Sequence, residues 1–556
     1  MRIWRIVDWI VVPALIAWLA LEPNAIHGWV DYLEAGQYLG PINGIVHGEV
    51  PYRDSYTVFG PLFLYVLALI MAICGQTLAV LRAYFHAASI LNLLIAYGVG
   101  RLICRTRLVR YAIPLILLVE FHHPFWSARW GGLRVGFEVA IVGCLIRYVQ
   151  QRTRRSLVLA GALTGLGLLY STDVGIVSII TAGALAMWMA FHRQTGLRPL
   201  FQHGLAYLTA AACVLLPFFA YFASQGALLP YLRAAFWDMP IHHMAVWGGK
   251  HGLPSLLAAS RDAPNVWSFL MSGTVKVYLP LVLSAGAGLY LLRARRRTPD
   301  ALERATVFLL SAHGLLLYLM AFRAIDGPQF QMALPAYVFL CGWWVERGWG
   351  SLRPALSAAR ISGRPIPSRT LLGGALIAAG IVYFLGSEKR YYGSLPNWFL
   401  YQREKGALSA SYSVPVWVSQ LDWVPLRCAR CGPVLVQPQQ QEEIDGVTQF
   451  LLDHTAPGEA VFAFPEHGIF NFFADRPGIS RFDIAGLAWT TPAWRAELLA
   501  ALREHPPRFA VVGKRLSNLA MAIKSEEELL PEVRGYLAAQ YRPIREFPTV
   551  AILEHQ

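Results

Sequence analysis

The sequence is short of charged residues and cysteine. Only 15% of its 556 residues are charged, against about 25% in an ordinary soluble protein, whereas 56% are hydrophobic. This composition excludes a disordered chain and argues against a wholly soluble globule. Seven cysteines are too few for a disulfide scaffold. A phosphate-cradling GxxxxGK[ST] loop is also missing from the sequence, which argues against ATP-driven chemistry.

The positive charge is a topology signal. The net charge is +14, and only six of the 48 basic residues are lysine. Cytoplasmic loops of membrane proteins retain Lys and Arg, and one orientation of the chain puts every arginine cluster on the cytoplasmic side. We therefore expect no nucleic-acid partner. The clusters are Arg2 and Arg5, Arg101 to Arg110, Arg152 to Arg155, Arg193 and Arg198, Arg293 to Arg297, and Arg347 to Arg369.

Apolar runs long enough to cross a bilayer recur through the first 390 residues, so the sequence predicts a polytopic α-helical membrane protein with about 11 transmembrane helices. The run at 61–74 is too short to span, and we interpret it as a helix lying at the membrane surface. The first run is interrupted by Asp8 and is interpreted as a retained helix, not as a cleaved signal peptide. The predicted spans are 6–21, 78–103, 109–122, 135–149, 156–171, 174–191, 204–223, 269–292, 305–322, 331–346 and 371–386.

Three regions are predicted. Residues 1–386 form the transmembrane domain, which includes a large first outer loop at 22–77. Residues 387–441, rich in Trp, Tyr, Pro and Gln, form a linker. Residues 442–556 alternate between helix-like and strand-like segments, which predicts a small soluble α/β domain on the outer side.

The first outer loop carries the most informative polar residues. Carboxylates at the membrane surface are costly unless they are solvated or used. For Glu34 and Glu49 we favour the interpretation that a long outer loop carries charges because water is available, over a functional role. For Asp31, which lies where the chain enters a helix after Gly28 and Trp29, helix capping and catalysis are both open.

Several segments of the sequence resemble one known group. An acid shortly after the first span is followed by a helix of small residues, then by GEVPYRD at 48–54 and GPL at 60–62. This order resembles the GT-C superfamily of membrane glycosyltransferases, which includes the protein O-mannosyltransferases and lipid A aminoarabinose transferase. Weaker resemblances occur in GLGLLYSTDVG at 165–175, in RAIDGPQFQMALPAY at 323–337 and in TAPGEAVFAFPEHGIFNFFADRPG at 455–478.

The resemblance implies transfer of a sugar from a polyprenyl-phosphate donor to an envelope glycan, lipid or protein at the outer face of the bacterial inner membrane. One carboxylate would take the acceptor proton, and arginines would hold the donor phosphate. Asp31 matches the family's first-loop acid, with Asp54 as the reserve candidate. The candidate phosphate ligands are Arg53, Arg129, Arg134 and Arg323, and further site candidates are Tyr52, Asp173 and Asp326.

The sequence departs from the family at one place. Arg134 and Glu138 stand near the position where mannosyltransferase relatives carry a second Asp, and their spacing indicates a helix-face ion pair. No cofactor is predicted with certainty, and a divalent cation is left open. A few residues could contribute metal ligands, but we favour the interpretation that they are ordinary side chains at the membrane interface. They are His122, His123, Asp238, His242 and His243.

Two further hypotheses remain. The lone CxxC at Cys428 and Cys431 has no second pair, so a local disulfide is favoured over a zinc site. For the function, the alternative is a transporter or flippase, or an envelope assembly protein of the O-antigen ligase type. A transporter would concentrate charges in the middle of its spans, and this sequence places its notable acids and arginines in the outer loops.

Overall fold

A computed structural model describes most of the chain. The described residues are 2–21, 26–121, 132–192, 194–243, 255–266, 269, 273–294, 301–321, 329–362, 423–514 and 529–556. They fall into two compact units, which are described separately. The first unit comprises residues 1–23, 86–215 and 250–415, and the second comprises residues 24–85, 216–249 and 416–556.

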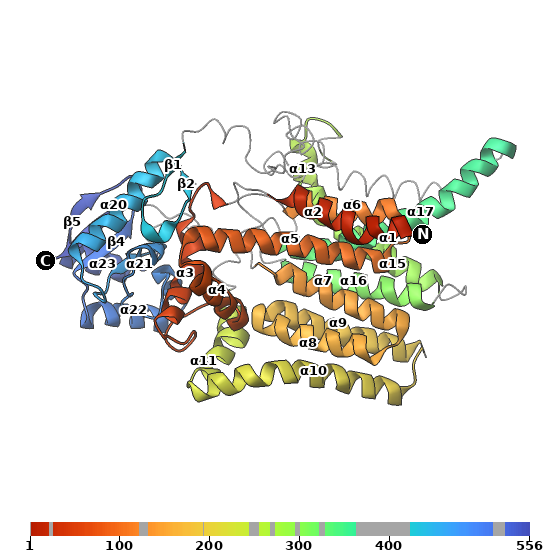
Figure 1. The fold of residues 1–556 in the computed structure, drawn as a ribbon, viewed down its shortest axis with the longest axis horizontal. Helices are drawn as coiled ribbons and strands as arrows, with labels where there is room; N and C mark the ends of the chain where they lie inside the picture. The colour runs from red at the N-terminus through yellow and green to blue at the C-terminus, as the bar shows by residue number, and fades with distance from the viewer. Residues whose placement is uncertain are drawn as a thin grey trace. The chain divides into compact units, whose positions relative to one another are not determined.

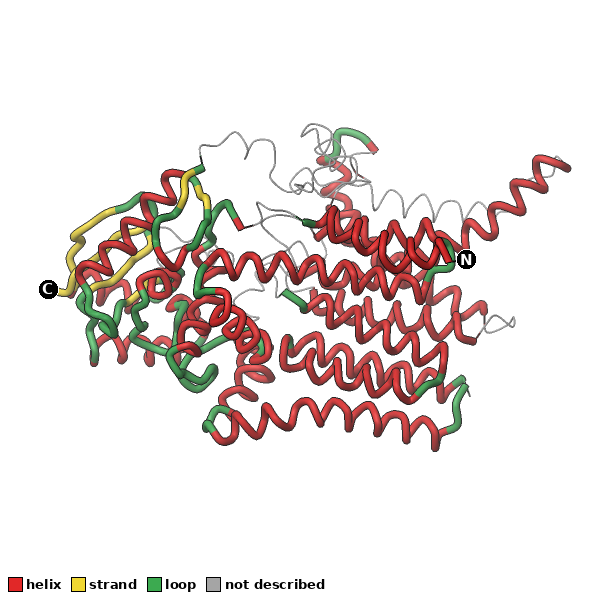
Figure 2. The backbone as a smooth tube through the Cα atoms, viewed as in Figure 1, coloured by secondary structure: helices red, strands yellow, loops and turns green. Residues whose placement is uncertain are grey.

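The first unit is helical wherever the structure describes regular secondary structure in it (Figures 1 and 2). Two of its helices, α5 and α10, have one end in the second unit. The helices are α1 (Arg2–Ile6), η1 (Val7–Val11), α2 (Val12–Ala20), α5 (Leu78–Ile103), α6 (Arg107–Phe121), α7 (Arg134–Gln151), α8 (Arg154–Tyr170), α9 (Thr172–Phe191), α10 (Leu197–Ser224), α13 (Leu256–Asp262), α15 (Gly273–Ala294), α16 (Ala301–Ala321) and α17 (Gln329–Ser362).

Among the residues that the structure describes, five helical segments are long and apolar enough to cross a membrane: Ile3–Ala20, Leu78–Ile103, Thr172–Phe191, Leu197–Ser224 and Ala301–Ala321. These are the helices of a multipass membrane protein. Ten of the eleven predicted spans coincide with helices, and the eleventh, 371–386, lies outside the described residues. The count of eleven spans stays a prediction, because the other helices are shorter or less apolar than a span requires.

Small residues bring two helices of this unit into close contact. A Cβ atom added at Gly161 of α8 would lie 2.1 Å from the carbonyl oxygen of Tyr207 in α10, and one at Gly165 would lie 2.7 Å from that of Ala211. Both distances are shorter than any real contact allows. The spacing of these two glycines, one helical turn apart, therefore serves helix packing.

The second unit combines the first outer loop, the segment after α10 and the C-terminal region. Its helices are α3 (Tyr32–Val46), α4 (Pro61–Cys74), α11 (Leu228–Arg233), η3 (Ala234–His243), η4 (Ala429–Cys431), α20 (Pro438–His454), α21 (Ile469–Ala474), η5 (Ala485–Thr490), α22 (Pro492–Glu504) and α23 (Pro531–Gln540). Helix α4 has 14 residues, so it is shorter than a span, as predicted.

A four-stranded sheet forms in the C-terminal region, with the strand order β3-β4-β6-β5. Strands β3 and β4 are parallel, and β6 pairs antiparallel with both β4 and β5. A separate two-stranded ribbon joins β1 (Val424–Pro425) to β2 (Leu435–Val436). The strands of the sheet are β3 (Phe462–Phe464), β4 (Phe509–Gly513), β5 (Tyr541–Glu546) and β6 (Val550–His555).

The outer loop and the C-terminal region share one apolar core. Leu33 and Tyr56 of the loop are buried together with residues of β3, β4 and α22. The Tyr56 ring lies 4.7 Å from the Trp494 ring, measured between centroids, and the Tyr56 amide donates to the carbonyl of Arg481 at 2.6 Å. The first loop therefore packs as part of the same compact unit as the C-terminal sheet. The predicted boundary at 386 lies outside the described residues.

Candidate functional site

Asp31 is the N-cap of α3. Its backbone is extended, and its Oδ1 accepts a hydrogen bond from the Glu34 amide at 3.1 Å. A side-chain oxygen in this position satisfies one of the amides that the first helical turn leaves without a partner. Of the two roles that the sequence left open, the structure shows helix capping, while the catalytic role stays a prediction.

The segment just before Asp31 is held by Arg82, near the start of α5. The guanidinium donates to the carbonyl oxygens of Ile26 and Trp29, both at 2.8 Å, and to that of Gly28 at 3.2 Å. On the other side, the Gly28 amide donates to the carbonyl of Leu435 at 2.8 Å. The backbone that leads into Asp31 is therefore fixed before the helix starts.

The segment that carries Tyr52, Arg53 and Asp54 is a tight turn closed by the Tyr52 amide, which donates to the Ser55 carbonyl at 2.8 Å. Tyr52 has a φ of 71°, which is uncommon for a bulky residue, and its hydroxyl donates to the carbonyl of Phe59. Its ring is buried in an apolar cluster with Phe222. Tyr52 thus anchors the turn.

Arg53 and Asp54 form a bidentate pair at the tip of this turn. The Arg53 Nε and Nη2 atoms lie 2.8 and 2.7 Å from the two carboxylate oxygens, and the Val50 amide also donates to the carboxylate at 2.8 Å. The Arg53 guanidinium beside Asp54 holds the pKa of that carboxyl below its usual value. Asp54 is consequently a weaker base than an ordinary aspartate.

Asp31 and the Arg53–Asp54 pair belong to opposite ends of α3. This helix has 15 residues, so its axis is about 22 Å long. Asp31 precedes its first turn, and the pair follows its last turn by several residues. The structure therefore separates two groups of predicted site residues that the sequence places in one loop.

Two further carboxylates flank the C-terminal half of α3. A Cβ atom added at Gly40 would meet Cβ and Cγ of Asp483 at 2.6 and 2.7 Å, and one added at Gly44 would meet Oε2 of Glu49 at 2.3 Å. Only glycine permits this close approach. Burial, followed by repulsion from Glu49, raises the pKa of Asp483 to about 8, and burial and repulsion from Asp54 raise the pKa of Glu49.

In the first unit, Arg134 and Asp173 form an ion pair. Arg134 begins α7 and Asp173 lies in the first turn of α9, where its Oδ1 also accepts from the Ser171 hydroxyl and the Val174 amide. Glu138 is buried beside His313, with 3.6 Å between its Oε1 and Nε2 of the imidazole. The structure therefore gives Arg134 and Glu138, which were expected to pair with each other, partners on other helices.

Three predicted site residues, Arg129, Arg323 and Asp326, lie outside the described residues. His122 and His123 do as well. Asp238 is buried and lies 3.5 Å from Nε of Arg233. Within the described residues, no group of three or more His, Cys, Asp or Glu side chains is arranged to hold a metal ion.

The chain matches solved structures by its fold, but it matches no known family or curated protein by its sequence. No protein-family model matches the chain, and no curated protein matches it. The structure of ArnT from Cupriavidus metallidurans bound to undecaprenyl phosphate superposes with a TM-score of 0.53 at 14% identity, over 99% of this chain and 97% of that one. The Archaeoglobus fulgidus oligosaccharyltransferase, in complex with Zn and sulfate, gives 0.50 at 13% identity over 91% and 68%.

The chain has the GT-C fold. The resemblance predicted from the first-loop motifs is therefore confirmed for the fold. At these identities the superpositions say nothing about individual side chains, so the site residues depend on the geometry of this chain alone.

Three residues of the C-terminal region that the sequence did not single out contact the first loop. Gln440 is hydrogen-bonded to Val30, Glu443 accepts from the Tyr32 hydroxyl, and Asp483 lies against Gly40. No local sequence pattern connects these residues to the loop, because some four hundred residues lie between them.

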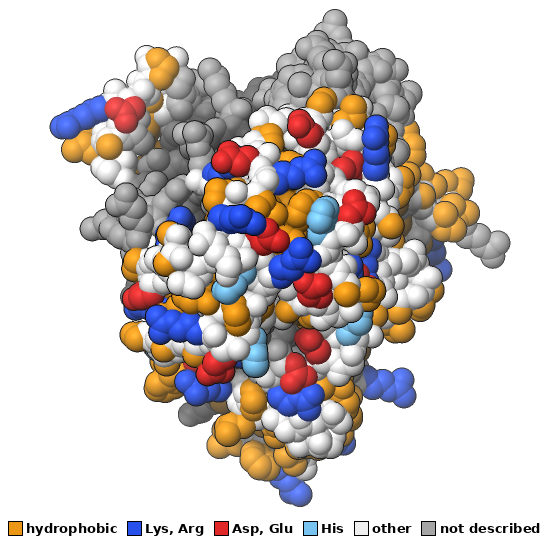
Figure 3. Space-filling view, turned by 90° about the vertical axis from the view of Figure 1, so that its left-hand side faces the viewer, with side chains coloured by type: hydrophobic (Ala, Val, Ile, Leu, Met, Phe, Trp, Pro, Cys, Tyr) orange, Lys and Arg blue, Asp and Glu red, His pale blue; other side chains and the backbone are white. Residues whose placement is uncertain are grey.

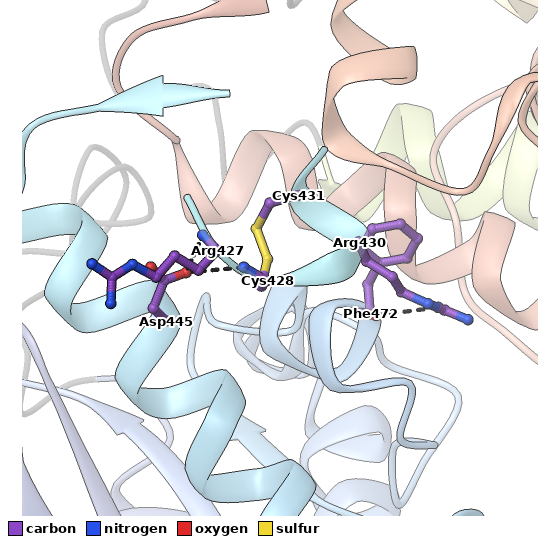
Figure 4. The surroundings of a disulfide bond; sticks show 6 residues. All are labelled: Arg427, Cys428, Arg430, Cys431, Asp445 and Phe472. Atoms are coloured by element: carbon purple, nitrogen blue, oxygen red, sulfur yellow. Dashed lines mark hydrogen bonds between the residues drawn. A yellow bond between two sulfur atoms is a disulfide. The ribbon is translucent and has the colours of Figure 1, made fainter. Parts of the chain in front are cut away.

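The predicted disulfide between Cys428 and Cys431 is present and encloses the short helix η4 (Figure 4). The amides of Arg427 and Cys428 donate to Oδ1 of Asp445 in α20, at 2.9 and 3.1 Å. From the same short helix, Arg430 donates to the Phe472 carbonyl at 3.1 Å and to Oδ1 of Asn43 in α3 at 2.6 Å. The disulfide loop thus connects α20 to the end of α3.

Charges of both signs are interspersed on the face drawn in Figure 3, and its coloured part carries no broad patch of one sign. A ligand bound there would be recognised by individual ion pairs and hydrogen-bond donors, not by a field of one sign.

Proposed function

We propose that this protein is a membrane glycosyltransferase that moves a sugar from a polyprenyl-phosphate donor to an envelope glycan, lipid or protein acceptor. The reaction takes place at the outer face of the bacterial inner membrane. The observation that carries the proposal is the GT-C fold, which extends over nearly the whole of a transferase structure bound to undecaprenyl phosphate. The loop acid at the start of α3 supports it.

Asp31 is the general base of this proposal. A polyprenyl phosphate is already a good leaving group, so the protein needs mainly a base for the acceptor and cations for the phosphate. Asp31 is placed on a backbone that is hydrogen-bonded on both sides, which favours a fixed position for its carboxylate.

The cations that hold the donor phosphate are proposed from the outer arginines. The candidates are Arg53, Arg129, Arg134 and Arg323. Arg53 lies with Asp54 beyond the other end of α3, so these two residues form the alternative site of the same reaction. The lowered pKa of Asp54 makes it the weaker of the two candidate bases.

The experiment compares Asp31→Asn with Asp54→Asn in a turnover assay of the purified protein with lipid-linked sugar and acceptor. Asparagine keeps the size of aspartate but cannot accept a proton at neutral pH, so Asp31→Asn should lose about 10²–10⁴-fold in turnover. Asp453→Asn, at an exposed position of α20, is the matched control and should remain active.

Near-normal turnover of Asp31→Asn would reject Asp31 as the base. Activity lost only in Asp54→Asn would assign the role of the base to Asp54, and the donor phosphate would then be expected at Arg53, beyond the other end of α3.

A further inference from the structure

The residue before Asp31 is paired with a side chain of α20. The Val30 amide donates to Oε1 of Gln440 at 2.9 Å, and Nε2 of Gln440 donates to the Val30 carbonyl at 2.7 Å. The side-chain amide thus pairs with both polar atoms of one residue, as a neighbouring strand would. Gln440 is 3% exposed, so water does not compete for these bonds.

The residue after Asp31 is paired with the same helix, one turn further along. The Tyr32 hydroxyl donates to Oε1 of Glu443 at 2.6 Å. The Tyr32 ring is buried and lies 5.3 and 5.4 Å from the rings of Phe470 and His467, measured between centroids. The side chain of Tyr32 is therefore fixed at both its apolar and its polar end.

Glu443 is a buried carboxylate that accepts hydrogen bonds from other groups of the protein. It is 2% exposed, and besides Tyr32 it accepts from the amide and the hydroxyl of Thr549, both at 2.6 Å. Burying a carboxylate costs free energy that several short hydrogen bonds must offset. An apolar residue could fill the same space without this cost, so packing alone does not account for the acid.

We propose that Gln440 and Glu443 are positioning residues that hold Asp31 at the place where it acts. The inference rests on the proposed function, because it assigns these two residues a role only through Asp31. By this account the C-terminal region takes part in catalysis without contacting the substrate: α20 fixes the residues on either side of the base.

The physical reason is the tolerance of proton transfer. A general base must lie within hydrogen-bond reach of the proton that it takes, and a displacement of about 1 Å can cost on the order of 10²-fold in rate. Losing one of two clamps should shift Asp31 by less than losing both. We therefore expect about a 10-fold loss of kcat for each single variant, with the KM of the lipid donor nearly unchanged.

The test uses the full-length protein in detergent and starts with Gln440→Met, which keeps the length of the side chain and removes both hydrogen bonds. Gln449→Met is the matched control, because Gln449 is an exposed residue of the same helix. Tyr32→Phe and Glu443→Gln are milder variants of the second clamp. The Gln440→Met and Tyr32→Phe variants should lose kcat, and the Gln449→Met control should not.

The decisive arm combines each variant with Asp31→Asn. A residue that acts through Asp31 has nothing left to position in that background, so Gln440→Met should not lower the residual turnover any further. The same fractional loss with and without Asp31 would show a merely structural role and overturn the inference. Normal kcat in both Gln440→Met and Tyr32→Phe would overturn it as well. Asp31→Asn alone reports on the proposed function, so the two failures are distinguishable.

Discussion

Asp483 shows how the environment of one residue sets its charge. In an unfolded chain an aspartate has a pKa near 3.9, whereas burial and the neighbouring Glu49 raise the pKa of Asp483 to about 8. Between these two values the folded protein holds a proton that the unfolded chain does not. The contribution of Asp483 to the free energy of unfolding therefore falls as the pH rises from about 4 to 8.

The substitution Asp483→Asn replaces the carboxyl group by an amide that does not titrate, and it keeps the shape of the side chain. We expect the wild-type protein to lose more thermal stability between pH 5 and pH 8 than Asp483→Asn does, as measured by thermal unfolding in detergent. The exposed control Asp453→Asn should behave like the wild type. An equal loss of stability in wild type and Asp483→Asn would contradict the raised pKa.

At the scale of the element, α3 depends on its glycines. An added Cβ at Gly40 would collide with the root of the Asp483 side chain, which cannot swing away, and a residue other than glycine before Pro41 disfavours the helical conformation. At Gly44 the collision is with the carboxylate oxygen of Glu49, the far end of a flexible side chain.

The two positions should therefore respond differently to alanine. Overpacking costs about 1–3 kcal/mol, while replacing glycine by alanine inside a helix gains about 0.5–1 kcal/mol. We expect Gly40→Ala to lower the melting temperature clearly and Gly44→Ala to leave it nearly unchanged. The prediction is wrong if Gly44→Ala is as destabilising as Gly40→Ala.

The sequence predicted most elements of the fold. Hydrophobic runs predicted the helices of the first unit, and strands β3 and β4 lie in the region 442–556 where helix-like and strand-like segments were expected to alternate. Strand β5 was missed because YRPIRE is polar, contains proline and has mostly exposed side chains, as an edge strand can. Its strand conformation depends on pairing with β6, which the local sequence does not indicate.

The candidate site was less predictable. Asp31 could be located because a helix start after Gly28 and Trp29 calls for a capping residue, which is a local signal. The contacts of its neighbours Val30 and Tyr32 with Gln440 and Glu443 could not be predicted, since no sequence rule pairs residues 410 and 411 positions apart. The same holds for Arg134 and Asp173, which come from different helices.

At the scale of the whole molecule, the arginine clusters predict one orientation in the membrane. Reporter fusions after Arg155 and Arg297 should report the cytoplasm, and a fusion after Arg390 should report the outer compartment. A fusion after Arg390 that reports the cytoplasm would contradict both the predicted number of spans and an outer location of the Asp31 site.

The central claim is that the protein transfers a sugar, and the most direct measurement is mass spectrometry of the envelope glycans and lipids of a deletion strain and its parent. The account predicts that the deletion removes one glycosyl unit from a defined envelope product. The wild-type protein should restore this unit, and an equal amount of Asp31→Asn should not. Unchanged envelope products in the deletion strain, or full restoration by Asp31→Asn, would contradict the account.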